Sequence, residues 1–139
     1  MIPAVPMILS KPPDLQGLPD NEMGAKIRAK YAGLKFIGYW VRPKTEYTEA
    51  SVGLPDPHDF VDEKWDAVQR NAVLRHLQAG TVFESWRGWS WCRFKCGEHK
   101  MGSQCLTDGK YVWPQGFAHY IAEHGVKPPQ EFIDHVLGV

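Results

Sequence analysis

A pair of cysteines followed by a pair of histidines is the feature that most constrains how this chain can fold. Three residues separate Cys92 from Cys96, and four residues separate His119 from His124 on a predicted helix. Thiolate sulfur and imidazole nitrogen are the ligands that tetrahedral Zn²⁺ prefers, and both spacings are typical of structural zinc sites. The sequence therefore predicts that one Zn²⁺ ion joins these two segments.

Two further ligand sets remain open, because the same region holds His99 and Cys105. One set joins these two residues to the cysteine pair. The other combines all three cysteines with one of the two helical histidines. The opposing interpretation is that the cysteines are small buried residues and the histidines lie on a helix surface. A closed set of four protein ligands would leave no position for water, so the metal would be structural.

The histidine pair imposes a geometric condition. Residues five apart on an ideal α-helix point in directions about 140° apart, since the helix has 3.6 residues per turn. His119 and His124 can therefore share an ion only if the last turn is loosened. Gly125 follows directly and allows this, because glycine accepts the backbone conformation that commonly ends a helix.

The length and composition indicate one soluble globular domain. With 139 residues, the chain can bury a core without a staple. The formal net charge is zero, so overall charge points to no class of partner. Three cysteines form an odd count that favours a reducing compartment. Because Pro3 and Pro6 interrupt a short apolar N-terminus, and no apolar run approaches ~20 residues, we expect a cytoplasmic protein without a membrane partner.

The pattern of elements predicts an α+β fold. Residues 1–22 contain five prolines and form an extended arm, either disordered or lying across the domain. Residues 23–139 form a single α+β domain, with a zinc-binding module at 86–125. We expect a small antiparallel sheet, one long helix and two short C-terminal helices. The predicted strands are 35–41, 81–86 and 111–113, the last leaving an Asp108-Gly109 turn, and the predicted helices are 62–79, 114–124 and one after Pro129.

Three segments carry a resemblance to a group of small uncharacterised bacterial and phage proteins. They are Glu84–Arg93, Leu106–Tyr120 and His124–Val126, with the pattern WRGWSxCR…LTDGxYxWPxGxxHY…HGV. The resemblance covers about residues 53–135, and in that group we associate the cysteines with a CxxC spacing where this chain has CxxxC. It implies no particular activity. A regulator or inhibitor of bacterial or phage origin would suit so small a chain.

Tryptophans alternate with arginines just before the cysteine pair. Trp and Arg dominate the hot spots of protein interfaces, so an exposed run of this kind predicts a contact surface for another protein. The opposing interpretation is a strand whose tryptophans are core, and we expect two of the three to be buried. The candidate contact residues are Trp86, Arg87, Trp89 and Trp91.

A basic segment suggests a nucleic-acid surface as an alternative. Residues 26–44 carry no acidic side chain and have aromatic residues interleaved, so they could neutralise phosphates and stack on bases. Alternatively, the aromatics are core and the acidic stretch 46–66 pairs with the basic one. The candidate residues are Lys26, Arg28, Lys30, Lys35, Arg42 and Lys44.

Signals for an enzyme are weaker, and we assign no catalytic residue. His58 lies between Asp56 and Asp59 and could act as an acid or base, although an Asp before a helix is more often a cap. Cys92 or Cys105 beside a histidine could form a nucleophile pair. A small zinc hydrolase with an open metal position is therefore the second alternative. The favoured hypothesis is a small zinc-stabilised module that binds another protein.

Overall fold

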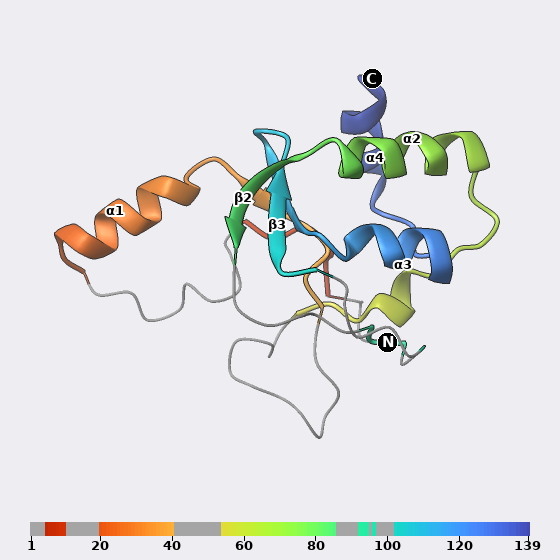
Figure 1. Cartoon of the computed structure of the whole chain (residues 1–139), viewed down its shortest axis with the longest axis horizontal. Coiled ribbons are helices and arrows are strands. Elements are labelled where there is room, and N and C mark those ends of the chain that lie inside the picture. The colour runs from red at the N-terminus through yellow and green to blue at the C-terminus, as the bar shows by residue number, and fades with distance from the viewer. Residues whose placement is uncertain (1–4, 11–19, 41–53, 86–91, 95, 97–101) are drawn as a thin grey trace.

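The computed structural model describes residues 5–10, 20–40, 54–85, 92–94, 96 and 102–139. These residues form an α+β domain, which confirms the predicted fold class (Figure 1). The helices are α1 (Glu22–Tyr31), the 3-10 helix η3 (Pro57–Phe60), α2 (Ala67–Gln78), α3 (Phe117–His124) and α4 (Gln130–Leu137). The strands are β1 (Lys35–Phe36), β2 (Thr81–Ser85), β3 (Gln104–Thr107) and β4 (Tyr111–Pro114).

The four strands form one mixed sheet in the order β1-β4-β3-β2. Strands β2, β3 and β4 are antiparallel as expected, whereas β1 joins the edge parallel to β4. The β3–β4 hairpin turns at Gly109, whose φ of 97° favours glycine. Strand β1 is shorter than predicted. The chain turns at Gly38, where φ is 88° and an added Cβ would lie 2.6 Å from the Phe117 ring.

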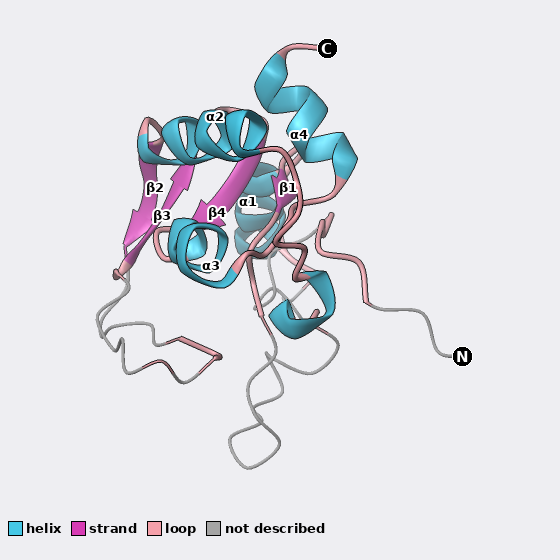
Figure 2. Cartoon of the chain, turned by 90° about the vertical axis from the view of Figure 1, so that its right-hand side faces the viewer, coloured by secondary structure: helices cyan, strands magenta, loops and turns pink. Residues whose placement is uncertain are grey.

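Alternating side chains of the sheet supply two cores. Tyr111 and Trp113 of β4 belong to the large cluster, whereas Val112 between them belongs to a smaller cluster with Phe36. This alternation is the period of two that a strand imposes. Helices α2, α3 and α4 lie on one side of the sheet and α1 on the other (Figures 1 and 2). The larger core therefore lies beneath α2, α3 and α4, and Tyr31 of α1 packs against the smaller one.

Helix α2 is shorter than the predicted 62–79 helix. It begins at Ala67, where the Asp66 carboxylate accepts a hydrogen bond from the Val68 N–H (2.8 Å) and caps the helix. The residues before Ala67 instead contact another part of the chain, where the Asp62 N–H donates a hydrogen bond to the Gly125 carbonyl (2.9 Å). This short antiparallel pairing joins the chain after η3 to the chain after α3, and it holds the end of α3 in place.

Helix α3 begins at Phe117 and not at Pro114, because Pro114 still pairs with Cys105 in the sheet. The N-terminal residues that the structure describes also join the domain. Met7 is buried in the large core, and Leu9 exchanges two backbone hydrogen bonds with Phe36. Among the described residues, no helix has the length and apolar character needed to cross a membrane.

Candidate metal centre

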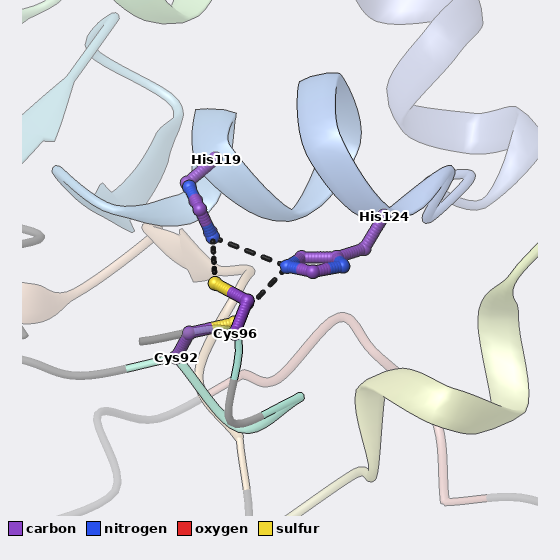
Figure 3. Close-up of side chains that lie close together, drawn as sticks. All are labelled: Cys92, Cys96, His119 and His124. Atoms are coloured by element: carbon purple, nitrogen blue, oxygen red, sulfur yellow. Dashed lines mark hydrogen bonds between the residues drawn. The ribbon is translucent and has the colours of Figure 1, made fainter. Parts of the chain in front are cut away.

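The structure brings Cys92, Cys96, His119 and His124 together, with each offering one ligand atom (Figure 3). The two histidines project from α3, and the two cysteines approach from the opposite side of the same point. All four ligand atoms lie within 4.8 Å of one another. The Phe94 N–H donates to the Cys92 sulfur at 3.4 Å, which fixes the turn that follows this cysteine.

Three of the distances between these atoms are close to the edges of a tetrahedral zinc site. Ordinary Zn–N and Zn–S bond lengths give tetrahedron edges of about 3.3 Å between two nitrogens and about 3.6 Å between nitrogen and sulfur. The Nε2 atoms of His119 and His124 are 3.2 Å apart. The sulfur–Nε2 distances are 3.2 Å for Cys92 with His124 and 3.4 Å for Cys96 with His119. These three distances are close to, or slightly shorter than, the edges around a bound ion, and all four atoms lie near enough to one another to share one.

The end of α3 meets the geometric condition on the histidine pair. The N–H groups of Gly125 and Val126 both donate hydrogen bonds to the Tyr120 carbonyl, five and six residues earlier in the sequence. In an ordinary α-helix, an N–H donates to the carbonyl four residues earlier. Winding more residues into this turn reduces the angle between His119 and His124. Gly125 has the left-handed φ of 67° that ends the helix here.

Burial sets the charge states at the centre. Cys92 is 1% exposed, and burial is the main reason that the pKa of its thiol is raised. Burial also lowers the pKa of His124, and the neighbouring His119 lowers it further. Both effects favour neutral groups in the absence of a cation. A bound dication would reverse the effect on the thiols, because a coordinating thiol is deprotonated.

Aromatic side chains surround the four candidate ligands. The Phe94 ring stacks on the His124 imidazole and also lies against the His58 ring. The Tyr120 hydroxyl accepts a hydrogen bond from the Arg93 N–H at 2.9 Å. Burial raises the pKa of Tyr120 to about 12, although the Arg93 N–H and charge act against this. The cysteine-bearing turn is therefore held to α3 by side chains that are not themselves ligands.

The alternate ligands have different positions. Cys105 is buried in β3 with the smaller core, and its thiol donates to the Glu84 carbonyl at 3.8 Å. The candidate metal clusters among the described residues do not include it. His99 lies outside the described residues. The three cysteines are free thiols.

The other candidate binding residues are only partly described. Trp86, Arg87, Trp89 and Trp91 lie outside the described residues, as do Arg42 and Lys44, and the side chain of Arg28 is not described. Phe36 and Trp40 of the basic segment are buried, so these two aromatics are core. Each of the three remaining lysines lies within ion-pair distance of a glutamate: Lys26 with Glu22 (4.0 Å), Lys30 with Glu84 (3.3 Å) and Lys35 with Glu131 (3.4 Å).

The acid–base candidate has a local structural role. The Asp56 carboxylate caps η3 through the His58 N–H (2.9 Å) and also contacts the His58 Nδ1 at 2.6 Å. The nucleophile hypothesis is met geometrically by Cys92 beside His124. Cys92 is almost fully buried, however, and a nucleophile must reach its substrate.

The structure also assembles a cluster that the sequence did not reveal. His76 of α2, Asp108 of the β3–β4 turn and His135 of α4 bring their ligand atoms within 4.8 Å of one another. Their separations in sequence are 32 and 27 residues. No local spacing could therefore signal this cluster, and Asp108 carried only the signature of a turn residue.

The fold and the centre define a small α+β domain with a Cys₂His₂ cluster that could hold a metal ion. Residues 29–137 match the sequence model of DUF7919, a family described as a domain of unknown function. The chain therefore belongs to that family. This confirms the resemblance to an uncharacterised group. Neither a curated protein nor a solved structure matches the chain.

Proposed function

We propose that this domain is a zinc-stabilised binding module in which Cys92, Cys96, His119 and His124 hold one Zn²⁺. One observation carries the proposal, namely that the four ligand atoms lie within 4.8 Å of one another, with three of their separations at 3.2–3.4 Å, near the edge lengths of tetrahedral zinc coordination. Two thiolates and two imidazoles form a set that suits Zn²⁺ better than Mg²⁺ or Ca²⁺, which prefer oxygen ligands.

The closed ligand set supports a structural role for this zinc. Four protein ligands would fill the tetrahedron and leave no position for water or substrate. The ion would join the cysteine-bearing segment to α3, adding to the Arg93–Tyr120 hydrogen bond and the Phe94 ring contacts that already connect them. Zinc binding worth about 10–16 kcal/mol is comparable with the about 5–15 kcal/mol net stability of a domain. The fold around residues 92–124 would therefore depend on the metal.

Elemental analysis of protein purified without added zinc tests the metal. We expect close to one zinc per chain, lost in Cys96→Ser and retained in Cys105→Ser. Cys96 is exposed, so its substitution should cost little packing, whereas the control removes a buried thiol outside the centre. A metal-free wild type whose melting curve is unchanged by added zinc would overturn the proposal. Equal loss of zinc from both variants would contradict the ligand assignment.

We further propose that the partner is another protein, contacted through Trp86, Arg87, Trp89 and Trp91. These residues occupy the short connection between Ser85, where β2 ends, and Cys92. A metal at Cys92 would anchor one end of this connection while the sheet anchors the other. Anchored aromatic and arginine side chains lose less entropy on binding, which favours affinity.

Affinity capture on the immobilised full chain tests this contact surface. We expect a protein retained by the wild type to be lost from a Trp86→Ala/Trp89→Ala/Trp91→Ala variant and after zinc chelation. A Lys26→Ala/Lys30→Ala variant is the control, because it alters an exposed surface of the basic segment and should still retain the protein. Retention that survives the tryptophan changes would contradict the proposed contact. Retained material that nuclease removes would favour the nucleic-acid alternative.

A further inference from the structure

The cluster of His76, Asp108 and His135 has the form of a second ligand set. Each imidazole presents its Nε2 to the same carboxylate oxygen, Asp108 Oδ2, at 2.7 Å. The three residues come from α2, the β3–β4 turn and α4, so the tertiary fold and not a local motif brings them together. None of them contributes to the Cys₂His₂ cluster.

Asp108 is oriented for this role by its own turn. Its Oδ1 accepts hydrogen bonds from the N–H groups of Lys110 (2.9 Å) and Tyr111 (2.8 Å), which leaves Oδ2 directed at the two imidazoles. Burial alone would raise the pKa of Asp108. The two backbone N–H groups and the two imidazoles outweigh burial and lower this pKa to about 2. The carboxylate is therefore ionised at neutral pH, as a metal ligand must be.

Aromatic packing limits the movement of both imidazoles. The ring centroids of His135 and Tyr111 lie 4.8 Å apart, and those of His76 and Phe132 lie 6.2 Å apart in a T-shaped arrangement. The cluster nevertheless remains partly exposed to solvent. The exposed fractions are 26% for the side chain of His76, 12% for Asp108 and 24% for His135. An ion could thus enter from solvent and keep water among its ligands.

We propose that His76, Asp108 and His135 form a second metal site, which binds a divalent transition ion such as Zn²⁺ or Co²⁺ with water in the remaining positions. Two imidazoles and one carboxylate are a ligand set that such ions accept, and three protein ligands leave the coordination open. The site would differ in kind from the closed Cys₂His₂ centre. It would exchange its ion readily and would select against soft ions that require thiolates.

The observed distances also describe the site in its metal-free form. Separations of 2.7 Å suit two N–H···O hydrogen bonds to one carboxylate oxygen. Around a bound ion, Nε2 and the carboxylate oxygen would lie about 3.0–3.4 Å apart, so the ligands need to separate by only a few tenths of an ångström. On binding, the Nε2 proton of each neutral imidazole would move to Nδ1 of the same ring by exchange with water, which frees the Nε2 lone pair for the ion. No net proton release is needed.

Cobalt titration of the full chain, first loaded with one equivalent of zinc, tests the second site. We expect further Co²⁺ binding with weak visible bands and without the near-ultraviolet charge-transfer band that cobalt–thiolate bonds give. His135→Gln should weaken this binding by roughly 10-fold or more while leaving the far-ultraviolet circular dichroism unchanged, because the amide can still donate to Asp108. His58→Gln is the control, since it removes an imidazole outside both clusters.

The titration also separates this proposal from that of the zinc centre. Cobalt entering the Cys₂His₂ cluster would reveal itself by the thiolate charge-transfer band, whatever happens at Asp108. If His135→Gln does not fold, paramagnetic broadening of the His76 and His135 ring signals in the wild type gives the same answer without a variant. Absence of that broadening at millimolar Co²⁺ would overturn the second site. Equal cobalt affinity of the wild type and a folded His135→Gln would do so as well.

Discussion

The phenyl ring of Phe94 lies nearly parallel to the imidazole of His124, with ring centroids 4.3 Å apart and planes inclined by 10°. His124 contributes one of the four candidate ligand atoms, and Phe94 sits midway between Cys92 and Cys96 in the sequence. The stack therefore orients a ligand on one element through a side chain on the other. It links the two halves of the proposed zinc centre although Phe94 is not itself a candidate ligand.

Replacing this aromatic ring should weaken metal binding. We expect Phe94→Leu to lower zinc affinity by about 10-fold, because residues that orient metal ligands typically contribute 10–100-fold to affinity. Phe94→Tyr keeps the ring and should stay close to the wild type. Competition with a chromogenic chelator measures both values. If Phe94→Leu and Phe94→Tyr bind zinc equally well, the stack does not orient His124.

Two glycines that end helices allow a matched comparison. Gly125 and Gly138 both have left-handed φ angles, 67° and 77°. An alanine at Gly138 would meet no atom within 4 Å, whereas at Gly125 its Cβ would lie 2.9 Å from Glu63 Cγ. We expect Gly138→Ala to cost about 1–2 kcal/mol of unfolding free energy from backbone strain alone.

Gly125→Ala should lower the free energy of unfolding by more than Gly138→Ala does. It should also reduce zinc affinity, because its strain falls in the widened turn that brings His124 to His119. Urea unfolding and the chelator competition give the two quantities for each variant. If Gly125→Ala is destabilised but binds zinc with unchanged affinity, the placement of His124 beside His119 does not depend on glycine at this position.

The sequence predicted the Cys₂His₂ grouping because its information is largely local. Each pair lies on one short segment, so the spacing alone places both members close together. The sequence predicted the widened last turn of α3 only as a condition for His119 and His124 to share an ion. The end of this turn is held by a hydrogen bond from the Asp62 N–H to the Gly125 carbonyl, a long-range contact that local spacing does not reveal. The predicted 62–79 helix begins later, at Ala67, because the Asp66 carboxylate caps it through the Val68 N–H.

Non-local pairing accounts for what the sequence could not give. The aromatic and β-branched run after Lys35 indicated a strand but not that its first residues would pair parallel to β4. The His76–Asp108–His135 cluster likewise depends on how α2 and α4 pack beside the hairpin. Asp108 fits its turn so well, with both neighbouring N–H groups bonded, that its sequence context suggests no further role.

The hydroxyl of Tyr120 should stabilise the cysteine-bearing turn. It accepts the Arg93 N–H at 2.9 Å, while its ring packs against Trp40 and Phe94 in the core. Tyr120→Phe keeps the ring and removes the acceptor, so we expect a loss of about 1 kcal/mol and faster amide hydrogen exchange at Arg93. Hydrogen exchange at Gly138 should stay unchanged, as this residue lies at the end of α4. Unaltered exchange at Arg93 would argue against the proposed hold on this turn.

Asp108 should make stability depend on pH in the acid range. Its pKa of about 2 lies below the ordinary 3.8, so as the pH falls the unfolded chain binds the proton first and the folded state loses stability. The contribution is fully present above about pH 4 and disappears as the pH approaches 2. It amounts to about 1–2 kcal/mol, after allowance for solvent screening at this exposed turn.

Asp108→Asn isolates this contribution, because the amide oxygen can still accept the turn N–H groups but carries no charge. Without added metal, we expect the wild type to exceed the variant in unfolding free energy by that amount at pH 7. The difference should shrink steadily below pH 4, since protonation removes the same charge from the wild type. Urea unfolding of both proteins at steps from pH 7 to pH 3 measures the difference. A gap that stays constant over this range would mean that packing, and not the ionised carboxylate between His76 and His135, accounts for the loss.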